Sequence, residues 1–92
     1  MDEYPTEEVL EKIRRWSASD PIGLFNFIEE QWSNYGKINR LESGVIQLVT
    51  GGWSGNEDIV SALNDNQAVW SMFWKVSWRG GLHEFHVPES FP

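Results

Sequence analysis

A glycine-rich stretch is the first place in this chain where residue types and spacing could do chemistry. Residues 50–57 read TGGWSGNE, with three glycines within five positions. A glycine-rich turn between a strand and a helix can bind a phosphate through its backbone N–H groups. The residues that would form such a site are Gly51, Gly52, Ser54, Gly55 and Asn56.

The same stretch lacks the features of the common phosphate-binding loop. Its glycine spacing differs from that of a Walker loop, it contains no lysine, and Glu57 and Asp58 follow it directly. Two carboxylates at this point would repel an anion. The sequence therefore favours a tight turn, with a Ser or Asn cap for the next helix and a buried Trp53, over a phosphate or nucleotide site.

Catalytic residues are hard to assemble from this sequence. His83 and His86 lie three positions apart on an expected strand, so their side chains would point to opposite faces and could not share a metal. The chain has no cysteine, which removes thiolate ligands and cysteine nucleophiles. No spacing forces two carboxylates, or a Ser-His-Asp set, into one pocket. We expect a protein that is not an enzyme and has no catalytic residue, metal site or cofactor.

The charge balance bears on possible partners. Fourteen acidic residues against seven Lys and Arg give a formal charge of −7, which disfavours direct binding to nucleic acid and permits a partner with a basic surface. The candidate contacts are Glu7, Glu8, Glu11, Glu29 and Glu30. A solvated helix face is the simpler explanation of these acids. The alternative is a nucleic-acid mimic that imitates a phosphate array.

Length and composition limit the architecture. The 92 residues fit one domain, 1–92, with extended tails expected at 1–4 and 88–92. The first residues are acidic with no apolar region after them, and no run of about 18 apolar residues occurs, so we expect a cytoplasmic protein without a membrane contact. Six tryptophans exceed what a small core needs, and tryptophan is enriched at protein interfaces.

The densest hydrophobic pattern covers residues 69–87. Apolar residues occupy every even position from Trp70 to Trp78, which predicts a strand with Trp74 in the core; a helix at the start of this stretch is the alternative. Gly80-Gly81 predicts a two-residue hairpin loop. The resulting pairs are Trp78 with His83, Val76 with Phe85, Trp74 with Val87, Lys75 with His86, and Ser77 with Glu84.

The remaining elements follow from amphipathic patterns and turn residues. Residues 6–17 predict a short helix, and Asp20-Pro21 predicts the start of a second, which the glycine of residues 34–36 would stop. Residues 37–41 and 45–50 predict a hairpin, and a third helix is expected from 54–56 to 64–66. The order is α-α-β-β-α-β-β, an α+β fold with helices packed on an antiparallel sheet.

Several of these motifs together resemble a group of small uncharacterised proteins encoded by phages and prophages. The resemblance covers roughly residues 16–88 and rests on TGGWSGNE, the Met72-Phe73-Trp74 run, residues 79–81 and Phe85. It carries no activity, cofactor or catalytic residue. It implies the cytoplasm of a bacterial host, where small acidic phage proteins often bind and disable host machinery, including defence complexes such as CRISPR effectors.

These observations predict a non-enzymatic, acidic protein-interaction module. Its partner would be a host protein with a basic surface, such as a nucleic-acid-handling or defence complex, and its contact would be the acidic helical face or a surplus tryptophan. Two alternatives remain open. One is a small-ligand or nucleotide-binding domain that uses the TGGWSGNE turn, and the other is a phage structural or assembly component.

Overall fold

The computed structural model describes residues 4–88, in which four helices and four strands follow one another in the order α-α-β-β-α-α-β-β. The α+β fold class is confirmed, with one helix more than expected. The helices are α1 (Glu7–Arg14), α2 (Pro21–Gln31), α3 (Ser54–Asp65) and α4 (Gln67–Phe73). The strands are β1 (Lys37–Arg40), β2 (Val45–Val49), β3 (Trp74–Trp78) and β4 (Leu82–His86).

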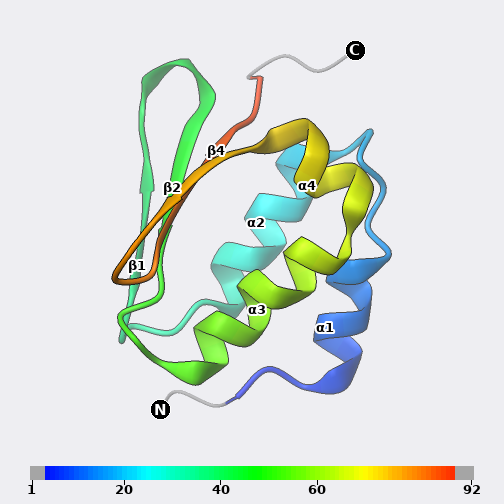
Figure 1. The fold of residues 1–92 in the computed structure, drawn as a ribbon. Helices are drawn as coiled ribbons and strands as arrows, with labels where there is room; N and C mark the ends of the chain where they lie inside the picture. Colours follow the sequence, from blue (N-terminus) through cyan, green and yellow to red (C-terminus); the bar gives the residue numbers. More distant parts are fainter. Residues whose placement is uncertain (1–3, 89–92) are drawn as a thin grey trace.

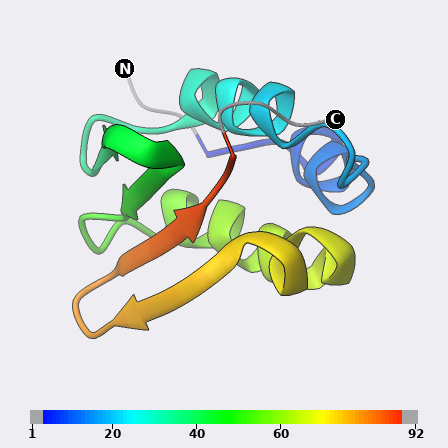
Figure 2. The ribbon, with the colours of Figure 1, turned by 90° about the horizontal axis from the view of Figure 1, so that it is seen from above.

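The molecule has two layers. All strands pair antiparallel in the order β1-β2-β4-β3, and the helices lie together on one face of this sheet (Figures 1 and 2). The core lies between the layers, where the Phe25 and Phe85 ring centroids are 5.2 Å apart. Its largest fully buried apolar side chains are Phe25, Phe85, Ile13, Leu24, Ile28, Leu48, Ile59, Leu63 and Val69.

The first two helices begin as expected and end earlier. Asp20 accepts a hydrogen bond from the Gly23 N–H at 3.1 Å, with proline at the first helical position. Helix α2 ends at Gln31, before the expected glycine stop at residues 34–36. The reason is that the Ser33 N–H donates to the Asn56 side chain at 3.0 Å instead of to a helical carbonyl. A contact from α3 therefore decides where α2 ends.

The prediction of a strand over residues 69–73 was wrong, because these residues belong to helix α4. Asn66 caps the helix by accepting a hydrogen bond from the Val69 N–H at 3.2 Å. Val69 and Phe73, four residues apart, are both buried. The alternating apolar residues do not mark a buried face, since Met72 is 55% exposed. Trp74, expected in the core, is 39% exposed.

The hairpin register also differs by one position from the prediction. Trp78 pairs with Leu82, Ser77 with His83 and Val76 with Glu84, and an irregularity between Trp74 and Val76 lets Trp74 pair with Phe85. The loop has three residues, 79–81, and the Thr50 N–H donates to the Gly81 carbonyl at 3.0 Å, a bond that extends the ladder between β2 and β4. A one-residue shift exchanges the two faces of a strand, so Ser77 lies on the helix side beside His83, and Val76 and Trp78 lie on the other face.

The expected tails lie mostly outside the described residues. Tyr4, at the inner end of the first tail, packs against Trp53 with ring centroids 4.9 Å apart. None of the helices within residues 4–88 is both long and apolar enough to cross a membrane.

Candidate functional site

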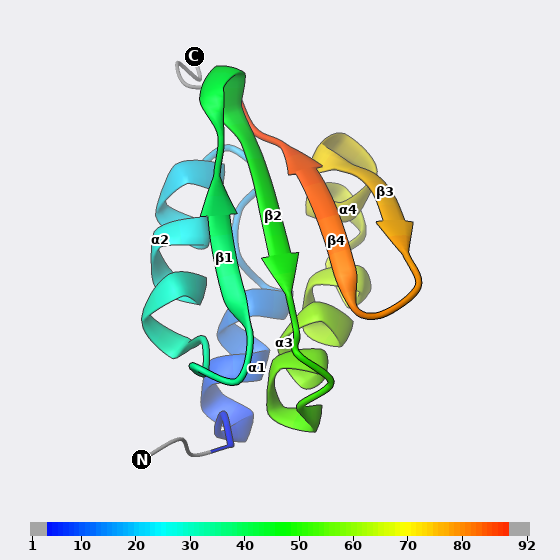
Figure 3. The same cartoon turned by 90° about the vertical axis from the view of Figure 1, so that its left-hand side faces the viewer.

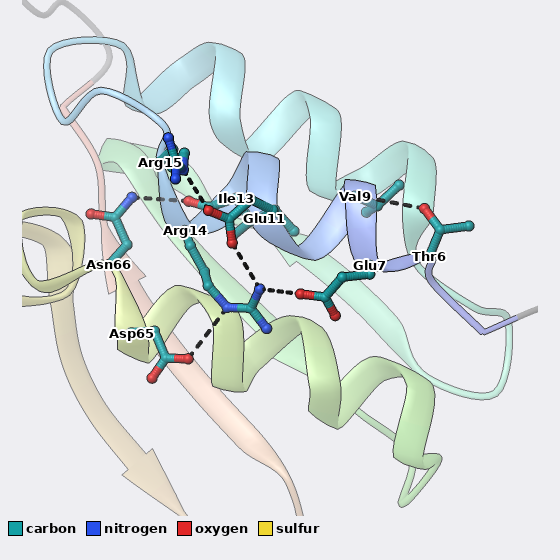
Figure 4. Close-up of polar contacts among 9 residues, drawn as sticks. All are labelled: Thr6, Glu7, Val9, Glu11, Ile13, Arg14, Arg15, Asp65 and Asn66. Atoms are coloured by element: carbon teal, nitrogen blue, oxygen red, sulfur yellow. Dashed lines mark hydrogen bonds and ion pairs between the residues drawn. The ribbon is translucent and has the colours of Figure 1, made fainter.

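Three of the candidate acidic residues are ion-paired within the protein, and two of them, Glu7 and Glu11, pair with Arg14. The Arg14 side chain extends from α1 toward α3, and its Nη1 is 2.7 Å from Glu7 Oε2 and 3.1 Å from Glu11 Oε1 (Figure 4). Its Nε is 3.5 Å from Asp65 Oδ2, and Arg15 also pairs with Glu11. Hydrogen bonds from Arg15 and Arg14 lower the pKa of Glu11. Glu7 and Glu11 therefore hold the Arg14 side chain on α1, and Arg14 joins α1 to α3 through Asp65.

The other candidate acids are spread over different surfaces. Glu29 on α2 pairs with Arg40 on β1, with 2.9 Å between Oε1 and Nη2. Glu8 borders a shallow hollow with Lys12. Glu30 is exposed and has no ion pair with any cation of residues 4–88. The five acids do not share one helix face, and their contact with a partner stays a prediction.

The backbone geometry of the TGGWSGNE turn explains its glycines. Gly51 and Gly52 have φ angles of +68° and +78°, a region that L side chains rarely adopt. A Cβ on Gly51 would also overlap the Tyr35 carbonyl oxygen, and one on Gly55 would overlap the Trp53 ring. Trp53 is half-buried and occupies the N-cap position of α3, where no side chain accepts a hydrogen bond from the first turn. The prediction of a Ser or Asn cap was therefore wrong.

The side chain of Asn56 uses its hydrogen-bonding groups within the protein. It is buried, its Oδ1 accepts from the Ser33 N–H at 3.0 Å, and its Nδ2 donates to the Thr50 carbonyl at 3.1 Å. Ser54 Oγ donates to the Tyr4 hydroxyl at 2.9 Å. These contacts hold the turn against the segment that joins α2 to β1. They leave ligand binding at this turn a hypothesis without support from the geometry.

One face of the sheet faces away from the helices (Figure 3). We call it the open face, and its central residues are Val45, Gln47, Val49, Val76, Trp78, Leu82 and Glu84. The register places Val49, Leu82 and Trp78 in one row across β2, β4 and β3. Trp78 is 47% exposed. A tryptophan in this position gives the face a large apolar contact.

A polar row crosses the open face beside this apolar row. Asn39 Nδ2 donates to Gln47 Oε1 at 3.3 Å, and Gln47 Nε2 donates to Glu84 Oε1 at 3.1 Å. The chain of bonds orients both amides and the carboxylate. The open face therefore combines an apolar row with oriented hydrogen-bonding groups, as protein interfaces do.

A groove lies on the other side of the hairpin, between β3–β4 and α3. Its volume is about 370 Å³, and its lining consists of Glu57, Val60, Ser61, Asn64, Trp70, Ser77 and His83. Ser77 Oγ is 2.7 Å from His83 Nδ1, and Trp74 Nε1 donates to Ser77 Oγ at 2.8 Å. Burial lowers the pKa of His83, while the Glu57 carboxylate acts in the opposite direction.

The contact between Ser77 and His83 does not by itself make an activated nucleophile. An indole N–H can only donate, so Ser77 Oγ accepts the hydrogen bond from Trp74 with one of its lone pairs. Within residues 4–88 no carboxylate hydrogen-bonds to His83 to orient it, and no group of three His, Cys, Asp or Glu side chains could hold a metal ion.

Sequence reasoning missed the groove because it placed His83 and Ser77 on opposite faces of the hairpin. The correct register pairs them directly. A weaker signal was present in the helix, where Glu57, Ser61 and Asn64 fall on one polar face.

Comparison of the chain with protein-family models, curated proteins and solved structures finds no match.

Proposed function

We propose that this protein is a non-enzymatic interaction module that binds a protein partner with a basic surface through the open face of its sheet. The observation that carries this proposal is the placement of Trp78, which is 47% exposed on a face that no helix of residues 4–88 covers. Exposed tryptophans surrounded by apolar neighbours are typical anchors of protein interfaces.

The charge of the chain supports the choice of partner. A formal charge of −7 attracts a basic surface and speeds encounter at low ionic strength. Glu8 and Glu30 are exposed and, within residues 4–88, form no ion pair, so they are available for this attraction. The apolar row of the open face then supplies the short-range contact.

The edges of the sheet favour a face contact over strand pairing with another chain. Edge strand β1 has only four residues, with Lys37 and Arg40 at its ends. Edge strand β3 is irregular between Trp74 and Val76. Short, charged or irregular edges discourage edge-to-edge association. This argues against a role as an assembly component that grows by adding strands.

The identity of the partner follows from the resemblance to phage and prophage proteins. In that setting a small acidic protein acts on the host, and the basic surfaces of nucleic-acid-handling machinery are suitable targets. We propose inhibition of such a host complex in the bacterial cytoplasm, with a CRISPR effector as one example. The nucleic-acid mimicry in this proposal is limited to charge.

The test is affinity capture from bacterial host cells with three proteins: the parent, Trp78→Ala and Met72→Ala. Met72 is a matched control because it is also exposed but lies on α4, on the helix layer. We expect the parent and the control to capture the same basic protein, and Trp78→Ala to retain less than about a tenth of it, as for an interface anchor. Equal capture by all three would refute the open face as the contact.

A further inference from the structure

We propose that the groove between α3 and the β3–β4 hairpin binds a guanidinium group, supplied by an arginine side chain of the protein partner. The source of the arginine rests on the proposed function, while the chemistry of the site rests on the groove alone. Its volume of about 370 Å³ is large enough for one side chain to enter.

The wall formed by α3 offers acceptors. Glu57, Ser61 and Asn64 are spaced by four and three residues, so they lie on one face of the helix and line the groove together. They present a carboxylate, a hydroxyl and an amide oxygen. Glu57 forms no ion pair with a cation of residues 4–88. A guanidinium carries five N–H donors and no acceptor, so it matches this wall.

The opposite wall offers a flat aromatic surface. Trp70 lines the groove and stacks on Trp74, with ring centroids 5.4 Å apart and ring planes 13° apart. The Phe85 ring is T-shaped to Trp70, also with centroids 5.4 Å apart. Because Trp74 covers one face of the Trp70 ring, this wall gives a guanidinium an apolar contact beside the acceptors of α3.

The electrostatics of the groove favour a cation over an anion. No Lys or Arg lines it, and Glu57 is its one carboxylate. Burial lowers the pKa of His83, which disfavours the protonated imidazole. A positive group would therefore gain a counter-charge in the groove, whereas an anion would meet Glu57.

The two binding surfaces are arranged so that one partner can reach both. β3 is an edge strand, with Ser77 on the groove side and Val76 and Trp78 on the open face. A partner that packs on the open face can extend an arginine around this edge into the groove. Such an arginine would add specificity to a contact that is otherwise mainly apolar.

The test is an NMR titration of the ¹⁵N-labelled full chain with capped arginine (N-acetyl-arginine amide), read at the indole N–H signals of Trp70 and Trp74. We expect saturable shifts in the millimolar range, as suits a single side chain without the rest of the partner. Capped citrulline, which has nearly the same shape without the charge, should give no saturable shift.

Two variants separate the carboxylate from general charge. Glu57→Gln should weaken binding by about tenfold or more, as expected for losing a charge-assisted contact. Asp58→Asn is the matched control, because Asp58 is the next residue and does not line the groove; its affinity should equal that of the parent. Both residues are exposed, and equal melting temperatures will show that both variants fold.

Three results would overturn the inference: no shift with capped arginine, equal shifts with capped citrulline, or unchanged affinity in Glu57→Gln. The titration contains no partner protein, so its failure leaves the capture experiment on Trp78 standing. Conversely, failure of that capture experiment leaves a guanidinium site demonstrated by the titration intact.

Discussion

Asn56 provides the sharpest test of whether the TGGWSGNE turn is a structural feature. The substitution Asn56→Ala removes the acceptor for the buried Ser33 N–H and one donor to the Thr50 carbonyl. The Ser33 N–H would be left without a partner, which costs about 1–3 kcal/mol. The Thr50 carbonyl still accepts from the Trp53 N–H at 3.3 Å, so its loss is smaller. With the cavity included, we expect a total of about 2–4 kcal/mol.

The assay is urea unfolding followed by tryptophan fluorescence. Slopes for small domains are about 1–3 kcal/mol per molar urea, so the midpoint should fall by about 1 M or more. Asn64→Ala is the control, because Asn64 is exposed on the same helix, and its change should stay within about 0.5 kcal/mol. A loss below about 1 kcal/mol for Asn56→Ala would refute the structural role and return this turn to the list of candidate ligand sites.

Three further predictions concern the turn, the core and the groove. Gly51→Ala should lower the free energy of unfolding more than Gly52→Ala, because both residues have positive φ but only Gly51 lacks space for a Cβ. Chemical denaturation will measure the two losses, and equal losses would contradict the turn geometry. Phe85→Ala should cost about 3–5 kcal/mol, and Trp74→Ala about 1–2 kcal/mol, since only Phe85 is fully buried; the reverse order in thermal melts would place Trp74 in the core after all. The pKa of His83 measured by NMR should lie below 6.5, so the unfolded chain takes up a proton on this side chain before the folded protein does. The free energy of unfolding should therefore fall as the pH drops through 6.5 and level off below the pKa of the folded protein. If His83→Gln shows the same dependence of stability on pH, His83 is not its origin.

Local signals in the sequence were sufficient for most of the fold. Asp20 followed by Pro21 marks a helix start because both residues act on their own backbone, and the structure has the helix there. The hairpin of β1 and β2 likewise follows from β-branched residues between turns. Such patterns depend on neighbours in the sequence, so one chain is enough to show them.

The errors arose where distant residues decide the outcome. Asn66 caps α4 and also donates to the Ile13 carbonyl at 2.9 Å, so the capping residue is itself held by a contact 53 positions away. The bond from the Thr50 N–H to the Gly81 carbonyl and the irregularity of β3 between Trp74 and Val76 cannot be read from an alternation of apolar residues. Trp74 was placed in the core because alternation resembles burial, yet it is 39% exposed and stacks on the half-buried Trp70.

The candidate site was harder to predict than the fold for the same reason. The acids were visible in the composition, but the pair between Glu29 and Arg40 depends on how α2 lies against β1. The groove needs the correct register to bring Ser77 beside His83. A surplus of tryptophan pointed to a contact surface, and only the arrangement of layers shows that Trp78 faces away from the helices.

The most direct test of the account is a cross-saturation NMR experiment on the complex with the captured partner. Saturation of the partner's protons should transfer to the Trp78 indole and to the methyl groups of Val49 and Leu82, which form the apolar row of the open face. The methyl group of Val9 on α1 should stay unaffected, since α1 belongs to the helix layer. Transfer to Val9 and none to the open face would contradict the account and direct attention to the acidic helices instead.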